Sequence, residues 1–300
     1  MKYSFDNKKI EDLRVGDIFE FGSYPQDLVE DSNIIAKIKD LCETPNQKKE
    51  IWNDFEYRTG KHYFTDIVLS GQCYRCVFSK KHRIDKILYE YSDYKDNQVY
   101  IFEFKPIRWK VLSVKEDCAM LVSEKLIDTY EYFYSSRKRK INKEIVYPNN
   151  YRYSIVREWL NTTFYNSAFT DKEKCLIKSN VVRNDASTTK KEANAYVCED
   201  TVDKVFLLSY QEAKALFSEN KSRWKKTTEY AKSQGCFAYK TRDAKYNNAV
   251  WWLRSPDSNY CDSVRCVGDG GGMGDGGFSI ANESVISLEG IAPVIVIKYK

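Results

Sequence analysis

Segments that alternate apolar and polar residues lie near both ends of the chain, and segments with helical spacing lie between them. Residues 15–26 alternate in this way, and residues 291–300 form an apolar run that is typical of a buried strand. In the middle, Ser154, Thr170 and Ser209 each precede an apolar-periodic stretch, where a serine or threonine caps a helix. Strands on either side of a helical middle predict an α+β fold whose terminal strands meet in one sheet.

The other strand signals are two hairpins and one buried strand. Residues 62–78 are typical of two strands around a Ser-Gly turn, and residues 106–127 of a second hairpin with a polar turn. The stretch AVWWLRSP, residues 249–256, indicates a buried strand. No internal repeat is present, and with the terminal strands in one sheet we expect a single domain over residues 1–300, with an elaboration on its core at about residues 27–100.

The stretch GDGGGMGDGG, Gly268–Gly277, holds seven of the 13 glycines. Glycine brings no side-chain packing and loses much conformational entropy on folding, so we expect a surface loop here. No lysine follows the glycines as in a phosphate-binding P-loop, and no helix start follows as in a dinucleotide fold, which argues against nucleotide binding. Asp269 and Asp275 offer too few oxygens for calcium, and solvated turn residues are the simpler interpretation.

The cysteines and histidines give weak catalytic and metal signals. The chain has nine cysteines and no apolar leader, so we expect reduced thiols. Cys73 and Cys76 form one C-x2-C pair, but zinc needs a second pair, and the spacing of Cys261 and Cys266 is loose. The two histidines, at positions 62 and 82, lie in no motif, so a Ser-His or Cys-His dyad is not expected. We expect no metal and no cofactor.

Charge and hydropathy limit the partners of the chain. The net charge is +5, and the basic run at residues 135–143 is typical of a solvated loop tip, so we expect no nucleic-acid partner. No stretch approaches 18 apolar residues, so no membrane span is expected. Without a leader, synthesis in the cytoplasm is expected, with a phage virion or the cell surface as further locations. The 23 tyrosines suit a binding surface as well as a core.

Six stretches, in order from Val15 to Lys298, resemble the bacterial domain family DUF6273, whose function is unknown. They are VGDIFEFGSYPQ, PIRWKVLS, SIVREWLNTTFYNSAFTDKEKCLI, DKVFLLSYQEA, TEYAKSQG and WWLRSP. That family in turn resembles C-type-lectin-fold proteins, among them formylglycine-generating enzymes and proteins diversified by retroelements. The resemblance implies a small antiparallel sheet joining the two termini, helices in the middle, and a long irregular C-terminal region that displays the binding surface. Ala292 stands where the family usually has arginine.

The same resemblance implies the roles of individual residues. Diversified proteins of this kind vary near the C-terminus among Asn, Asp, Ser, Tyr, Cys, Arg and Gly. The expected ligand-binding surface comprises Trp252, Ser258, Asn259, Tyr260, Asp262, Ser263, Arg265, Asp269, Met273, Asp275 and Phe278. The expected scaffold comprises Trp109, Trp159, Trp251, Leu253 and Arg254, because two adjacent tryptophans of a flat strand point to opposite faces and arginine donates to several carbonyls.

These observations predict a non-enzymatic binding protein whose ligand is a protein or a glycan. One alternative is a copper-dependent oxidase of the formylglycine-generating type, since Cys261 and Cys266 stand five positions apart and soft thiolates suit Cu(I). Another alternative is a structural module of a phage or cell-surface particle.

Overall fold

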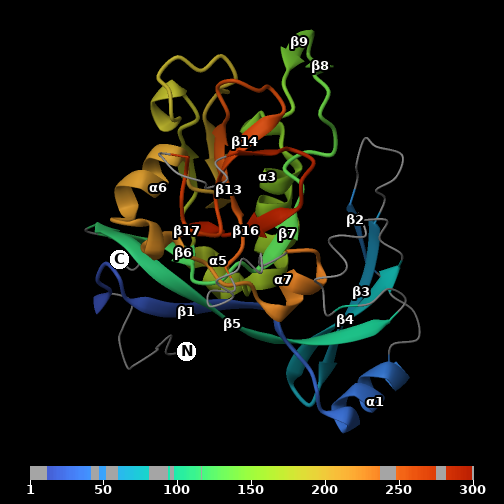
Figure 1. The fold of residues 1–300 in the computed structure, drawn as a ribbon. Coiled ribbons are helices and arrows are strands. Elements are labelled where there is room, and N and C mark those ends of the chain that lie inside the picture. The colour runs from blue at the N-terminus through green and yellow to red at the C-terminus, as the bar shows by residue number, and fades with distance from the viewer. Residues whose placement is uncertain are drawn as a thin grey trace.

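The computed structural model describes residues 12–41, 47–51, 60–80, 94, 98–115, 117–236, 248–274 and 282–298. Its fold is α+β, with strands near both ends of the described chain and short helices in the middle (Figure 1). The fold class predicted from the sequence is therefore confirmed. The assignment to one domain over residues 1–300 stays a prediction.

A sheet of eight strands runs through the molecule, in the order β12-β17-β6-β5-β4-β3-β2 with β1 paired to β5. These strands are β1 (Ile18–Leu28), β2 (Gln47–Ile51), β3 (Gly60–Leu69), β4 (Gln72–Lys80), β5 (Val99–Lys115), β6 (Cys118–Ser123), β12 (Val205–Phe206) and β17 (Val294–Lys298). The strands near the two ends lie in one sheet, as predicted. This sheet is large, however, and not the small one expected, and β5 and β6 lie between β1 and β17.

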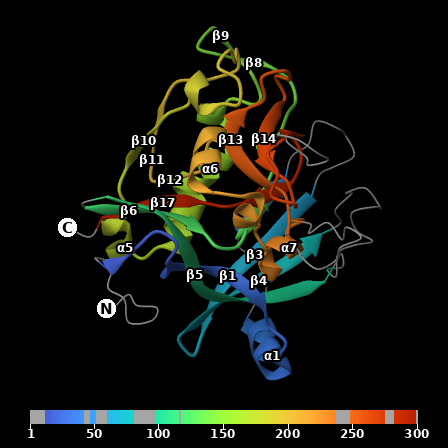
Figure 2. The same cartoon turned by 60° about the vertical axis from the view of Figure 1, so that its left-hand side comes forward.

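A second sheet of five strands has the order β15-β14-β13-β16-β7. Its members are β7 (Asp128–Tyr130), β13 (Trp251–Pro256), β14 (Ser263–Val267), β15 (Asn282–Ser284) and β16 (Glu289–Ile291). The described residues also form two small hairpins, β8 (Arg139–Ile141) with β9 (Glu144–Val146) and β10 (Asn180–Val182) with β11 (Thr201–Asp203). Figures 1 and 2 show β13, β14 and the β8–β9 hairpin at one end of the molecule, and β3, β4 and α1 at the other.

The helices are short, and α3, α5 and α6 begin at the caps that the sequence predicts. The α-helices are α1 (Ser32–Leu41), α3 (Ile155–Trp159), α4 (Tyr165–Ala168), α5 (Asp171–Leu176), α6 (Tyr210–Leu216) and α7 (Glu229–Ser233). Tighter turns are η2 (Tyr151–Tyr153), η4 (Ala186–Thr188) and η5 (Asn220–Arg223), and the π-helical turn η3 (Leu160–Phe164) joins α3 to α4. Ser154 caps α3, and Thr170 and Ser209 form full capping boxes with the glutamates three residues later.

One hydrophobic core joins both sheets and the helices. Trp109, Trp159 and Trp251 all belong to it, as predicted. Trp109 donates from Nε1 to the Phe21 carbonyl at 2.7 Å and stacks on the Phe169 ring, with the centroids 6.3 Å apart. The core therefore takes in a tryptophan from each of β5, α3 and β13.

The region at about residues 27–100 extends the edge of the large sheet with β2, β3 and β4. It has a small hydrophobic cluster of its own, made by Ile38, Tyr74, Cys76 and Ile101. Arg75, which is 3% exposed, lies between this region and the main core. Its guanidinium makes two hydrogen bonds to Asp66, at 2.7 and 2.8 Å, and donates to the hydroxyls of Tyr24 and Tyr230. A buried charge is tolerated only when it is paired in this way.

Candidate functional site

The C-terminal region predicted as the binding surface is the β13–β14 hairpin with the turn that connects its strands. Trp251 pairs with Val267 and Trp252 with Cys266, and an irregularity follows before Pro256 pairs with Val264. We call residues 257–262, between the two strands, the Tyr260 turn. Because β13 is the central strand of its sheet, the turn is carried by a rigid element.

A buried ion pair fixes the Tyr260 turn from inside. The Asp257 carboxylate accepts from the backbone amides of Asn259, at 2.7 Å, and Tyr260, at 3.3 Å. This is the local bonding by which an aspartate stabilises a turn. The other oxygen of Asp257 accepts from Nη1 of Arg265 at 2.9 Å, with both side chains less than a tenth exposed. Arg265 also donates to the carbonyl of Met273 at 2.8 Å.

A second support comes from Asn149, which is fully buried beneath the turn. Its Nδ2 donates to the carbonyls of Tyr260, at 3.1 Å, and Ser263, at 3.2 Å. Its backbone amide donates to the carbonyl of Cys261 at 3.3 Å. The backbone of the turn is thus held on both sides, and a ligand that bound it would meet a preorganised surface.

The side chains that the turn presents to solvent are those of Asn259 and Tyr260. Tyr260 is 60% exposed, the largest exposure of any described tyrosine. Lys191, from the loop before β11, donates from Nζ to Oδ1 of Asn259 at 3.0 Å. Ser258 and Asp262 beside them are half-buried. A tyrosine ring with a polar amide and a cation next to it is suited to contact with a ligand.

The structure corrects three of the predicted surface residues. Trp252, Arg265 and Met273 are all buried and belong to the scaffold. Ser263 and Asp269 are half-buried, and Asp275 and Phe278 lie outside the described residues. Among the described residues of the predicted surface, 252–278, those that can contact a ligand are therefore in the Tyr260 turn and immediately beside it.

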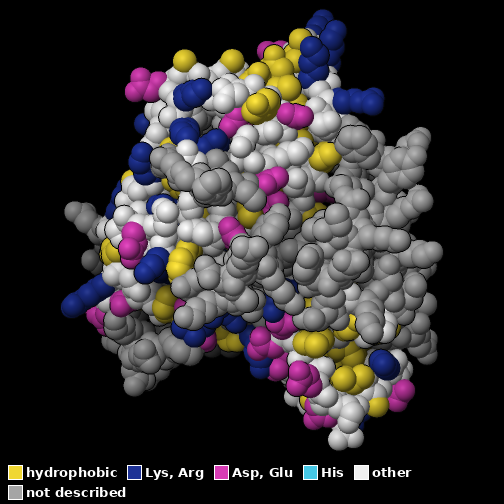
Figure 3. Space-filling model, viewed as in Figure 1, with side chains coloured by type: hydrophobic (Ala, Val, Ile, Leu, Met, Phe, Trp, Pro, Cys, Tyr) yellow, Lys and Arg dark blue, Asp and Glu magenta, His cyan; other side chains and the backbone are white. Residues whose placement is uncertain are grey.

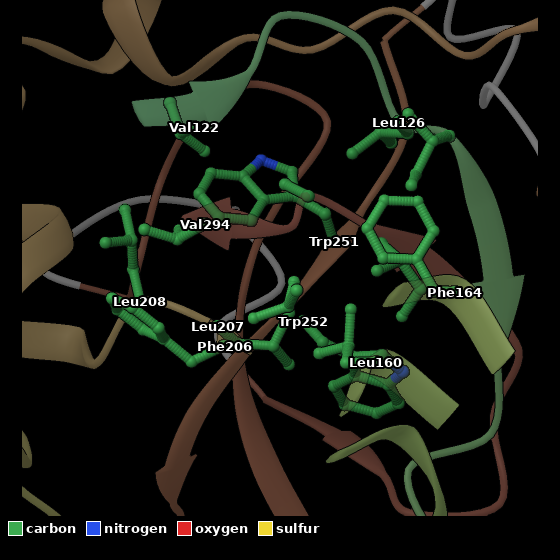
Figure 4. Packing of buried hydrophobic residues seen from close by; sticks show 14 of the residues in the cluster. Val122, Leu126, Leu160, Phe164, Phe206, Leu207, Leu208, Trp251, Trp252 and Val294 are labelled. Carbon is green, nitrogen blue, oxygen red and sulfur yellow. The ribbon is translucent and has the colours of Figure 1, made fainter. Parts of the chain in front are cut away.

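Trp252 is buried because both faces of β13 are covered. Adjacent residues of a strand point to opposite faces, so Trp251 and Trp252 enter different parts of the core. Trp251 lies beside Val122 and Val294 of the large sheet (Figure 4) and donates to the carbonyl of Arg223 at 3.2 Å. Trp252 donates to the carbonyl of Tyr130 at 2.8 Å and packs edge-on against Tyr132. The expectation that one of the two would lie under the ligand surface is wrong.

Arg254 has the contacts that the sequence predicts for a scaffold arginine. It is 1% exposed and donates to the carbonyls of Leu207, at 2.7 Å, and Arg183, at 3.0 Å. It also forms a two-point ion pair with the Glu212 carboxylate, in which Nη2 lies 2.6 Å from Oε1. Burial raises the pKa of Glu212, but hydrogen bonds and charge from Arg254 outweigh it, and the pKa is lowered overall. Leu253, beside it, is fully buried.

The glycine segment is irregular as predicted, but much of its described part is not at the surface. Gly271, Gly272 and Met273 are buried, and Gly270 is exposed. Gly271 has φ +78°, and a Cβ built on it would lie 2.0 Å from the backbone oxygen of Asn220. Its own carbonyl accepts from Nε of Arg223 at 2.8 Å. The absence of a side chain lets this backbone lie directly against η5.

Replacing Gly271 by alanine is expected to lower the free energy of unfolding. A residue with a side chain costs roughly 1–2 kcal/mol in the left-handed conformation, and the loss here should be larger than that. The added methyl group would also collide with the Asn220 backbone. Gly16→Ala is the matched control, because Gly16 has φ +92° and nothing within 4 Å of its Cβ position. Urea unfolding compares the two variants, and equal losses would contradict the close approach.

The cysteines do not fit the copper alternative well. Cys266 is fully buried, and this burial raises the pKa of its thiol well above the usual value. A copper ligand must be a thiolate, which such surroundings disfavour. Cys261 is half-buried in the Tyr260 turn. Of the C-x2-C pair, Cys76 is buried and Cys73 is half-buried, both on β4.

The described residues show neither a metal-binding cluster nor a membrane-spanning helix. Within the ranges that the structure describes, no group of three or more His, Cys, Asp or Glu residues could hold a metal ion. No helix in this part of the chain has the length and apolar character needed to cross a bilayer.

Comparison with known proteins identifies one family. The family described as "Domain of unknown function (DUF6273)" matches residues 116–299, which is more than half of the chain. The chain belongs to this family. The DUF6273 region takes in β6 to β17, with Arg254, the Tyr260 turn and the glycine segment. The stretches VGDIFEFGSYPQ and PIRWKVLS lie before it. No curated protein and no solved structure matches this DUF6273 chain.

Sequence reasoning missed two residues that shape the turn. Asp257 follows a proline and precedes Ser-Asn, which is a recognisable turn signal. Asn149 carries no such local signal, because its partners Tyr260 and Ser263 lie more than 100 positions away in the chain.

Proposed function

We propose that this DUF6273 protein is a non-enzymatic binding protein of the C-type-lectin-like group, and that its ligand contacts the Tyr260 turn. The observation that carries the proposal is a largely exposed tyrosine on a turn whose backbone is fixed by buried side chains. Tyrosine is a frequent anchor of binding interfaces, because it brings a large rigid ring and a polar hydroxyl at little entropic cost.

The arrangement also supports a limited form of retroelement diversification. Ser258, Asn259 and Tyr260 lie at or near the surface, so substitutions there leave the core intact. Arg265, in contrast, holds Asp257 and the Met273 carbonyl, and its replacement would disturb the turn itself. In this proposal, variation is confined to the turn and excludes the strands beside it. A role as a structural module of a phage or cell-surface particle stays a prediction.

The proposal is tested on an array that carries neutral glycans, acidic glycans and peptides. We expect the wild-type chain to bind one of these classes, and Tyr260→Ala to weaken that binding about tenfold or more, the usual effect of truncating an anchor residue. Tyr260→Phe keeps the ring and removes the hydroxyl, so it distinguishes their contributions to binding. Val68→Ala is the control, because Val68 is 69% exposed on β3 at the other end of the molecule. Binding that is unchanged in Tyr260→Ala, or the absence of any binding, would contradict the proposal.

A further inference from the structure

The β8–β9 hairpin and the Tyr260 turn lie at the same end of the molecule, and together they define a kind of ligand. We propose that this ligand is an acidic polysaccharide, a chain of sugar rings that bear carboxylates, and that the β8–β9 hairpin is its second binding element. The inference rests on the proposed function, which assigns ligand binding to the Tyr260 turn.

The hairpin is a paired projection that a tight turn closes. Asn142 and Lys143, at its tip, have φ values of 50° and 71°, the left-handed pair that makes a tight two-residue turn between twisted strands. The sequence predicts a solvated loop tip at residues 135–143, and the structure shows a paired hairpin here instead. Both Figures 1 and 2 show it standing out from the body beside the β13–β14 end.

The projection is strongly basic at its surface. Lys138, Lys140 and Lys143 are exposed, and Glu144 is the one acidic residue between positions 135 and 146. Figure 3 shows dark-blue side chains gathered at this tip, with hydrophobic side chains beneath them. Lys191 adds a cation on the Asn259 side of the Tyr260 turn. The charge at this end of the molecule is therefore complementary to a polyanion.

The base of the hairpin is clamped to the body of the protein. The guanidinium of Arg139 lies over the Phe133 ring, 3.7 Å from its centroid, and Nη2 donates to the carbonyl of Tyr153 at 3.0 Å. Val146, at the end of β9, is buried, and the chain then leads directly to Asn149 under the Tyr260 turn. The end of β9 thus lies three positions before Asn149, which holds the Tyr260 turn.

Exposed rings accompany the cations and favour a sugar chain over a nucleic-acid duplex. Tyr134 is 43% exposed and Tyr153 is 36% exposed, while Tyr260 is 60% exposed. The apolar face of a pyranose ring packs on an aromatic ring, and its carboxylate then points outward to a neighbouring ammonium group. A DNA duplex presents phosphates on its outer surface and no free ring faces. It would therefore contact the lysines but would not pack on the tyrosine rings.

The inference is tested by titration calorimetry with three polymers and the full chain. The probes are polygalacturonate, the same polymer with every carboxylate methyl-esterified, and duplex DNA. The test variant is Lys138→Ala/Lys140→Ala/Lys143→Ala, and the control is Lys37→Ala/Lys39→Ala/Lys172→Ala, which removes the same charge from exposed positions on α1 and α5. Tyr260→Ala is titrated beside them.

We expect polygalacturonate to bind, and both esterification and the hairpin variant to weaken binding about tenfold or more, an effect that grows at low salt. The control variant should stay within about threefold, the effect of unspecific charge alone. Duplex DNA that binds as tightly as polygalacturonate would overturn the inference, and so would a failure of polygalacturonate to bind.

The outcomes also separate this inference from the proposed function. Suppose that the esterified polymer binds as tightly as polygalacturonate, and that its binding is lost in Tyr260→Ala but unchanged in the hairpin variant. The inference of an acidic ligand is then wrong, while the proposed role of the Tyr260 turn is kept. If polygalacturonate binding is lost in the hairpin variant but unchanged in Tyr260→Ala, the proposed function fails and with it this inference.

Discussion

Replacing Arg254 by alanine is expected to lower the free energy of unfolding by about 3 kcal/mol, the low end of the cost of breaking a buried ion pair, because the Arg254 side chain is 1% exposed but that of Glu212 is 34% exposed. The substitution leaves the carbonyls of Arg183 and Leu207 without their donor and leaves Glu212 without its cation. Urea unfolding, monitored by tryptophan fluorescence, measures the loss. Arg254→Lys is the informative companion. Lysine keeps the charge but lacks the planar guanidinium group that reaches all three acceptors, so this variant should recover only part of the stability.

The effect of Arg254→Ala should also depend on pH. The pKa of Glu212 is lower in the folded protein than its ordinary value of 4.5, with Arg254 as the cause that outweighs burial. The stability from this pair is therefore fully present above that ordinary value, and it is lost as the pH falls through the folded pKa. The difference between wild type and Arg254→Ala should shrink in acid. A loss below about 1 kcal/mol at neutral pH, within the range of an ordinary surface change, would contradict the scaffold role.

Replacing Trp159 by alanine is expected to cost about 3–5 kcal/mol, the range for large aromatic truncations in a core. Trp159 is 6% exposed, and its ring centroid lies 4.6 Å from that of Tyr130 and 5.3 Å from that of Phe164. It joins α3 to β7, so the cavity would lie where the helices meet the second sheet. Tyr165→Ala is a control on the next helix, since Tyr165 is only half-buried. Equal losses for the two variants, or a loss below about 1 kcal/mol for Trp159→Ala, would contradict its place in the core.

The elements that the sequence predicted correctly are those with local causes. Ser154, Thr170 and Ser209 cap their helices because a hydroxyl satisfies an amide within three residues of itself. The hairpin of β3 and β4 closes at Ser70 and Gly71, both with positive φ. These features need no knowledge of the rest of the chain.

The candidate site was harder to predict, because burial depends on distant parts of the chain. Trp252 belongs to a strand whose two faces are covered by different layers, and the sequence of β13 does not reveal this. Arg265 resembles a surface residue of a variable loop until its partners, Asp257 and the Met273 carbonyl, are placed around it. The pairing of β17 with β6, and its separation from β1, is likewise a property of the whole sheet.

The central claim is that the Tyr260 turn binds a ligand while the residues beneath it carry the fold. It is tested most directly by measuring ligand affinity and urea unfolding on the same two variants, Tyr260→Ala and Arg265→Ala. For Tyr260→Ala, the account predicts binding weakened about tenfold or more, with a stability change below about 0.5 kcal/mol, as for other exposed residues. Arg265→Ala should cost several kcal/mol, roughly 3–5, because it leaves the buried Asp257 unpaired. Unchanged affinity in Tyr260→Ala, or a larger stability loss there than in Arg265→Ala, would contradict the account.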